Sequence, residues 1–185
     1  MTNAERILSG LDEKLTTAVE LTLYGRAALH LGFEQAMREH ALSRDVDAVL
    51  WMGQAEELDA TTNFWPAIDA LNKQLADQEL FISHFFTEDQ VILRPDWREN
   101  RVRIRGPWRH LALYRLGDID LLLSKLMRDD PIDREDALFI VSCAGLSRAD
   151  VEKALPEARI PDVPEIREQF ELSSKKLLDA LSRRR

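Results

Sequence analysis

The chain has 185 residues and a net charge of −8, with 45% hydrophobic and 31% charged residues. These values are typical of one globular domain with, at most, a small appendage, and they argue against a nucleic-acid-binding surface that covers the whole protein. The longest apolar run, residues 137–146, is too short to cross a bilayer, and the N-terminus is charged too early for a secretory signal, so we expect no membrane association. The single cysteine, Cys143, cannot form an internal disulfide, which favours a reducing, cytoplasmic location.

Hydrophobic periodicity predicts that helices and strands alternate up to about residue 117. Apolar residues recur at helical spacing near the N-terminus, and strict alternation follows. In chain order we expect a helix over 7–18, a strand over 19–25, a helix over 26–42, a strand over 45–52, helices over 55–60 and 65–78 (the second capped by Asn63), and strands over 80–86, 90–94, 101–106 and 110–117.

After Gly117 the pattern becomes helical. We expect helices over 118–127, 133–145 and 165–181, and Ser147 with an acid three residues later forms a capping box for a further helix. The fold class is therefore predicted to be α+β. A domain of residues 1–117 holds a mixed sheet flanked by helices, and a helical subdomain of residues 118–185 follows it.

Two acidic residues stand at the start of the strand expected at 45–52, where acids are uncommon. Asp45 and Asp47 alternate with apolar residues, so their side chains share one face, with Cα atoms about 6.5–7 Å apart. Two carboxylates at this spacing can hold a magnesium ion, which leaves sites for phosphate oxygens and aligns a triphosphate with a hydroxyl nucleophile. The alternative is a solvated strand end that binds no metal.

A second feature lies about twenty residues upstream of the acid pair. The strand expected to end at Gly25 runs directly into a helix that begins at Arg26. A helix N-terminus at the edge of a sheet presents N–H groups to anions, phosphates especially. Glycine also lets a ligand approach the backbone closely. The alternative is an ordinary strand-to-helix turn.

Together these features resemble the polymerase-beta-like minimal nucleotidyltransferase fold. In that fold a strand ending in glycine, a helix, and a strand with an acid–hydrophobe–acid motif follow one another. More specifically, the chain resembles the abortive-infection branch of nucleotidyltransferase-like toxins and their bacterial relatives. That branch carries serine or threonine two residues before the first acid, where Ser43 stands. It also carries a lysine, seven residues, an aspartate, two residues and an aspartate, a spacing matched by Lys125, Asp133 and Asp136.

The resemblance covers residues 19–50 and 117–140, and it implies an activity. This is Mg²⁺-dependent transfer of a nucleotidyl group from a nucleoside triphosphate to a hydroxyl acceptor on RNA or protein, in a toxin–antitoxin or phage-defence system with an antitoxin as protein partner. The resemblance implies metal binding by Asp45 and Asp47, catalysis by these two and Lys125, and nucleotide binding by Gly25, Arg26, Ser43, Lys125, Asp133 and Asp136. The alternative for Asp133 and Asp136 is a favourable interaction of acids with the helix dipole.

The chain departs from the family pattern in ways that open a second hypothesis. Arg26 follows the glycine where glycine or serine is usual, and its side chain can grip a phosphate or fill the nucleotide slot. A later strand offers Ser83 and His84 where the fold normally supplies a third carboxylate. The rival hypothesis is a degenerate member that binds a nucleotide, RNA or a protein without turnover. A carboxylate within about 4–5 Å of Asp45 and Asp47 favours the enzyme, and Ser83 or His84 in that place favours the rival. An accidental match in an unrelated α/β protein is the third hypothesis.

Seven arginines lie between residues 94 and 115 of this otherwise acidic protein. Every second residue of the strand expected at 101–106 is an arginine, so three guanidinium groups share a face, and Trp97 lies nearby. Guanidinium groups match phosphate oxygens and indole rings stack on bases. We expect RNA contacts from Arg101, Arg103, Arg105 and Trp108. The alternative is a solvated face whose arginines pair with the protein's excess acids.

Overall fold

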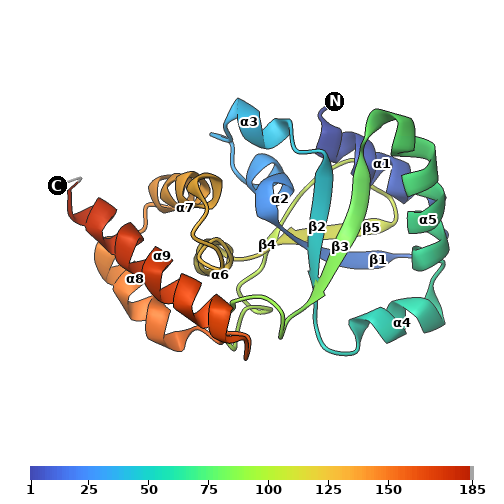
Figure 1. The fold of residues 1–185 in the computed structure, drawn as a ribbon. Helices are drawn as coiled ribbons and strands as arrows, with labels where there is room; N and C mark the ends of the chain where they lie inside the picture. The colour runs from blue at the N-terminus through green and yellow to red at the C-terminus, as the bar shows by residue number, and fades with distance from the viewer. Residues whose placement is uncertain (184–185) are drawn as a thin grey trace. The chain divides into compact units, whose positions relative to one another are not determined.

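The structure of the chain, a computed structural model, describes residues 1–183 (Figure 1). Two compact units can be distinguished, and neither is continuous in sequence. The first consists of residues 1–87 and 102–115, and the second consists of residues 88–101 and the chain from residue 116 onwards. The predicted boundary after residue 117 stays a prediction, and the last two residues of the predicted 118–185 subdomain lie outside the described residues.

The first unit contains a five-stranded mixed sheet in the order β3-β2-β1-β5-β4. In the middle, β1 (Val19–Tyr24) pairs antiparallel with β2 (Asp45–Leu50) and parallel with β5 (Leu111–Arg115). At the edges, β3 (Phe81–Thr87) runs parallel to β2, and the short β4 (Val102–Arg103) runs antiparallel to β5. The helices of this unit are α1 (Asn3–Lys14), α2 (Gly25–Gly32), α3 (Arg38–Ala41), α4 (Gln54–Thr61), α5 (Phe64–Leu75) and the 3-10 turn η1 (Ala76–Gln78). The predicted α+β class, a mixed sheet flanked by helices, is confirmed.

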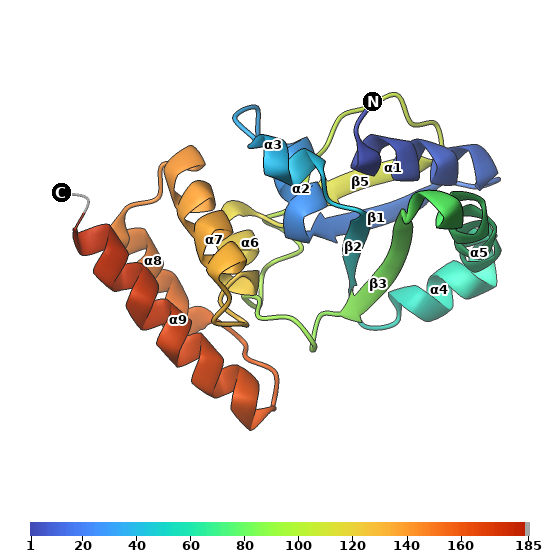
Figure 2. The same ribbon diagram turned by 45° about the horizontal axis from the view of Figure 1, so that its top comes forward.

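Alternation in the strands builds the core of the first unit. Leu21 and Leu23 of β1 and Val46 and Ala48 of β2 are fully buried, and each pair is separated by one residue, so each pair projects from a single face of its strand. Helices supply the other half of this core, because α1 packs against α5 and β2, α2 packs against β1 and β2, and α5 packs against β3 (Figure 2). Burying each large aliphatic side chain contributes about 1.5–3 kcal/mol.

The helix predicted over 26–42 is wrong as a single element, because residues 33–37 are not helical and separate two helices, α2 and α3. α2 ends at Gly32, and Phe33 adopts φ −130° and ψ 130°. The guanidinium carbon of Arg115 lies 4.3 Å from the centre of the Phe33 ring. A side chain at Gly32 would collide with Arg115 as well. The buried arginine therefore leaves no room for a side chain at the last residue of α2.

Asn63 precedes α5, as predicted, but its side chain does not cap that helix. Its Oδ1 accepts from the backbone N–H of Thr16 at 3.0 Å, and its Nδ2 donates to the carbonyl of Lys14 at 2.8 Å. The Asn63 side-chain amide thus hydrogen-bonds to backbone groups at the end of α1 and just after it, rather than to backbone groups of α5.

The second unit is largely helical. Its elements are α6 (Asp118–Ser124), α7 (Pro131–Cys143), α8 (Arg148–Ala154), the 3-10 turn η2 (Leu155–Glu157) and α9 (Pro164–Ser182). The predicted capping box is confirmed, because Ser147 accepts from the backbone of Asp150 and Asp150 accepts from the backbone of Ser147. Within residues 1–183, no helix combines the length and the apolar character needed to cross a membrane.

Residues 88–101 join the second unit through one isolated β-bridge and through side-chain contacts rather than through a strand. The strand predicted over 90–94 is wrong, since only Leu93 forms an isolated bridge, with Arg159. Asp120 of α6, fully buried, accepts from the backbone N–H of Arg94 at 2.8 Å and from its guanidinium at 2.9 Å. Charge-assisted hydrogen bonds of this kind are stronger than neutral ones. They tie this segment to the start of α6.

One carboxylate in the first unit connects α1 to the start of β5. Asp12 accepts three backbone hydrogen bonds, from Arg109 at 2.9 Å, His110 at 2.7 Å and Leu111 at 2.8 Å. Burial alone would raise the pKa of Asp12, but the three donors outweigh it, so this pKa lies below its ordinary value. The charged form is therefore favoured in the folded protein.

We expect Asp12→Asn to lower the free energy of unfolding by about 1.5–3 kcal/mol, the range for hydrogen bonds to a charged group. Urea unfolding at neutral pH measures this loss. Glu13→Gln is the matched control, because Glu13 is an exposed neighbour on the same helix. Equal losses in the two variants would contradict the anchoring role.

The same variant should change how stability depends on pH. Because the folded pKa of Asp12 lies below the unfolded value of about 3.9, its contribution is present above the unfolded pKa and is lost as pH falls through the folded pKa. Unfolding curves recorded at decreasing pH should therefore fall less steeply in Asp12→Asn than in the wild type over this acidic range. Parallel curves would show that Asp12 titrates alike in both states.

Candidate functional site

Asp45, Asp47 and His84 form one cluster at the start of β2. One ligand atom from each residue lies within 4.8 Å of the other two, and the three belong to the first unit. His84 Nδ1 lies 3.0 Å from Asp47 Oδ1. The side chains of Asp47 and His84 are 22% and 54% exposed, so a ligand can reach the cluster from solvent. As strand alternation predicts, the two aspartates share a face.

A bulge in β3 places His84 in this cluster. Val46 pairs with Ile82, but the next residue of β2, Asp47, pairs with His84, which leaves Ser83 as the extra residue. In a regular ladder Ser83 would stand opposite Asp47, and the imidazole would lie on the other face of the sheet. Bulges are over-represented at sheet edges and next to active sites, where they re-aim a side chain. Here the bulge turns the imidazole toward the aspartates.

Neighbouring side chains hold two members of the cluster in place. Ser43 Oγ donates a hydrogen bond to Asp45 Oδ1 at 2.7 Å. The ring of His84 stacks on Phe86 with an interplanar angle of 16°, and Phe86 meets the edge of Tyr24. The Ser43 hydroxyl therefore has a defined partner in Asp45, and its predicted contact with a nucleotide stays a prediction.

Gly25 lies directly beside the acid pair. It has φ +70°, and a Cβ at this position would come within 2.7 Å of Asp47 Oδ2. Both facts require glycine, because other residues rarely adopt this φ and a side chain would displace the carboxylate. α2 begins at Gly25 with no side-chain cap, and Arg26 lies in its first turn. The backbone N–H groups of this turn therefore start next to Asp47.

The donor set of the cluster fits a divalent cation. Carboxylate oxygens bind Mg²⁺ and Mn²⁺, and imidazole nitrogen binds transition metals. Among residues 1–183, histidine rather than a third carboxylate completes the group. By the criterion set out from the sequence, this arrangement favours the rival hypothesis of binding without turnover.

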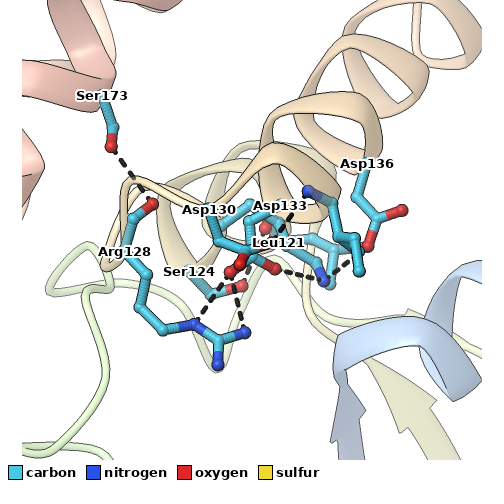
Figure 3. Close-up of polar contacts among 9 residues, drawn as sticks. Leu121, Ser124, Arg128, Asp130, Asp133, Asp136 and Ser173 are labelled. Carbon is cyan, nitrogen blue, oxygen red and sulfur yellow. Dashed lines mark hydrogen bonds and ion pairs between the residues drawn. The ribbon is translucent and has the colours of Figure 1, made fainter.

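Lys125, Asp133 and Asp136 form a buried ion-pair network in the second unit. The Lys125 ammonium, 7% exposed, donates to Asp133 Oδ1 at 3.1 Å and to Asp136 Oδ2 at 2.8 Å. Sequence analysis missed Arg128, which donates to Asp133 Oδ2 from Nε at 2.9 Å and from Nη2 at 2.8 Å (Figure 3). These contacts make Lys125 a strut within its own unit, and its proposed role toward a triphosphate stays a prediction.

The helix-dipole alternative explains only part of this network. Asp130 is the N-cap of α7, with its side chain accepting from the N–H of Ile132, and Asp133 lies in the first turn. Asp136 is beyond that turn and is fully buried. Its position is accounted for by Lys125 rather than by the dipole.

The predicted arginine strip does not form a regular strand. Within 101–106 only Val102 and Arg103 are in β4, so the predicted strand is wrong over the rest of that range. Arg101 lies over the Trp97 ring and Arg103 over the Tyr114 ring, at 5.9 and 4.9 Å from the ring centres. These rings hold two of the three guanidinium groups.

The surroundings of Trp97 and Trp108 differ from those of the open indole faces expected to stack on RNA bases. Trp97 is 1% exposed, and its Nε1 donates to Glu88 Oε2 at 2.8 Å, so it has no open ring face for a base. Trp108 packs against Gly106 and, with Arg105, lines a hollow of about 660 Å³ whose other wall includes Glu5 and Glu34. Acidic residues in that wall disfavour a phosphate backbone. RNA binding by the strip remains a prediction.

Comparison of the chain with models of protein families, with curated proteins and with solved structures finds no match. The resemblance to nucleotidyltransferases is therefore carried by the residues and spacings described above.

We expect Gly25→Ala to be more damaging than Gly53→Ala. Both glycines have positive φ, +70° and +87°, so both variants carry the backbone strain of about 1–3 kcal/mol. A Cβ at Gly53 meets nothing within 4 Å, whereas at Gly25 it meets Asp47. Urea unfolding should show a larger loss for Gly25→Ala, and equal losses would mean that Asp47 moves aside at no cost.

A second pair of variants tests the strut. Lys125→Met keeps the apolar stem but leaves buried carboxylates without their ammonium, so we expect a loss of about 3–5 kcal/mol in unfolding free energy. Arg128→Met removes the other cation from Asp133, but its side chain is 75% exposed, and we expect at most about 1 kcal/mol. Thermal or urea unfolding of both variants measures the difference. Similar small losses would show that the Lys125 network does not support the second unit.

Proposed function

We propose that this protein binds a nucleoside triphosphate together with a divalent cation at the Asp45–Asp47–His84 cluster, in a nucleotidyltransferase-like fold that binds without turnover. The observation that carries the proposal is the position of Gly25 against Asp47, which puts the first turn of α2 beside the cluster. A cation site next to a helix N-terminus combines two features that each favour phosphate.

Residues of the chain have distinct parts in this proposal. Asp45 and Asp47 would hold the cation, which when bound neutralises phosphate charge. Ser43 orients Asp45 through its hydrogen bond. Backbone N–H groups of the first turn of α2 would donate to phosphate oxygens, and the absence of a side chain at Gly25 keeps the approach open. Arg26 adds a guanidinium suited to phosphate.

Absence of a third carboxylate from the cluster supports binding rather than transfer. In the fold that the chain resembles, that acid serves as base or as ligand to a second cation. Here His84 stands in the place, on a bulge that fixes its pairing with Asp47. An imidazole offers nitrogen rather than the two oxygen donors of a carboxylate, so it does not replace that acid in kind.

Nucleotidyl transfer is the second candidate, and one observation favours it. The His84 imidazole is hydrogen-bonded to Asp47 at 3.0 Å, and a carboxylate that orients an imidazole is a common feature of general bases. In this candidate His84 accepts the proton of an acceptor hydroxyl on RNA or protein, and the antitoxin that the family resemblance implies is a separate protein partner.

Calorimetry with a non-hydrolysable nucleoside triphosphate tests the proposal. We expect binding that requires a divalent cation and weakens at least about tenfold, or about 1.4 kcal/mol, in Asp45→Asn and in Asp47→Asn. Asp59→Asn is the control, because Asp59 is an exposed acid on α4 of the same unit. Binding that is absent, or equal in all variants, rejects the proposal. Release of pyrophosphate from a hydrolysable triphosphate by the wild type, but not by His84→Ala, would establish the second candidate instead.

A further inference from the structure

We propose that His84 makes this cluster selective for a first-row transition-metal dication, such as Mn²⁺ or Co²⁺, over Mg²⁺. The inference rests on the proposed cation site and concerns which ion that site takes. Its basis is the replacement of an oxygen donor by an imidazole nitrogen at the third position of the cluster.

The distance between two donors matches a shared ion. Each donor of an octahedral Mg²⁺-sized ion lies about 2.1 Å from the ion. Two donors at right angles to each other are therefore about 3.0 Å apart, which is √2 times about 2.1 Å. His84 Nδ1 and Asp47 Oδ1 are 3.0 Å apart. Asp45 completes the group within 4.8 Å and has its carboxylate held by Ser43. Three protein donors leave further positions for phosphate oxygens or water.

Donor chemistry then sets the preference among ions. Mg²⁺ is hard, keeps its waters and takes oxygen ligands, so an imidazole adds little to its binding. Transition-metal dications gain from nitrogen donors, and affinity at mixed nitrogen and oxygen sites rises from Mn²⁺ through Co²⁺ to Ni²⁺. Two carboxylates with one imidazole therefore discriminate against Mg²⁺ in a way that three carboxylates do not.

The structure also shows that His84 is positioned for this contact. The bulge at Ser83 brings the imidazole to the aspartate face, and the stack on Phe86 fixes the plane of the ring. The 3.0 Å separation is also a hydrogen-bond distance, so His84 Nδ1 and Asp47 Oδ1 already face each other across the site.

Calorimetry of Co²⁺, Mn²⁺ and Mg²⁺, each alone and without nucleotide, tests the inference. We expect Co²⁺ to bind the wild type more tightly than Mg²⁺ does. In His84→Ala the Co²⁺ affinity should fall about 10–100-fold, because loss of a metal ligand should cost at least as much as loss of an outer-shell partner. The Mg²⁺ affinity of this variant should change little. His84→Asp should reverse the preference by strengthening Mg²⁺ binding. His110→Ala, which removes a histidine outside the cluster, should leave all three affinities unchanged.

Visible absorption of bound Co²⁺ gives a readout independent of affinity. Nitrogen coordination shifts and strengthens the ligand-field bands, and this change should be present in the wild type and in His110→Ala but lost in His84→Ala and His84→Asp. Because the His84 side chain is half exposed, these variants should fold, which circular dichroism checks.

The outcomes separate this inference from the proposed function. The selectivity is overturned if Mg²⁺ and Co²⁺ bind with equal affinity, or if the Co²⁺ bands do not depend on His84. In either case the proposed function still stands as long as the nucleotide binds with Mg²⁺. Histidine-dependent Co²⁺ binding without any nucleotide binding supports the metal site and rejects the proposed function. No binding of any of the three ions overturns the selectivity, and the proposed function then depends only on the nucleotide calorimetry described above.

Discussion

At the end of β1 the Asp47 carboxylate fills the space that a side chain at residue 25 would need. Only glycine can stand there, and its positive φ turns the chain from strand into helix within one residue. That turn sets α2 against β1 and β2. It also fixes which backbone groups lie next to the acid pair. The position of α2 and the surroundings of the acid pair therefore share one requirement, a residue without a side chain at position 25.

Features with strong local causes could be predicted from the sequence. Alternation placed Asp45 and Asp47 on one face of a strand, and the Ser147 capping box marked the start of α8, because both depend on residues a few positions apart. Features decided by distant residues could not be predicted. The need for glycine at the last residue of α2 depends on Arg115, which comes from another strand. The pairing of His84 with Asp47 depends on a bulge for which "LFISHFF" carries no marker.

Arginines in the sequence were hard to assign for a related reason. A guanidinium can pair with a buried acid, stack on a ring or remain in solvent, and the choice depends on tertiary neighbours. Arg94 pairs with Asp120, Arg103 lies over Tyr114, and Arg115 lies over Phe33. A basic stretch that looks uniform in sequence is thus divided among separate structural tasks. The buried pairs specify how segments meet, since an unpaired charge in the interior is strongly unfavourable.

The discontinuity of the two units has a consequence for synthesis on the ribosome. Residues 88–101 emerge before β5, the strand that pairs beside β1, and well before α6, which carries their partner Asp120. At about 5–20 residues per second, this segment spends part of translation attached to a sheet that is still incomplete and without the helix it binds. The first unit is complete in sequence at residue 115, so it can fold before the helices of the second unit have been made. The second unit begins with residues 88–101 but can close only after residue 116 and the helices beyond it have emerged, so it folds last.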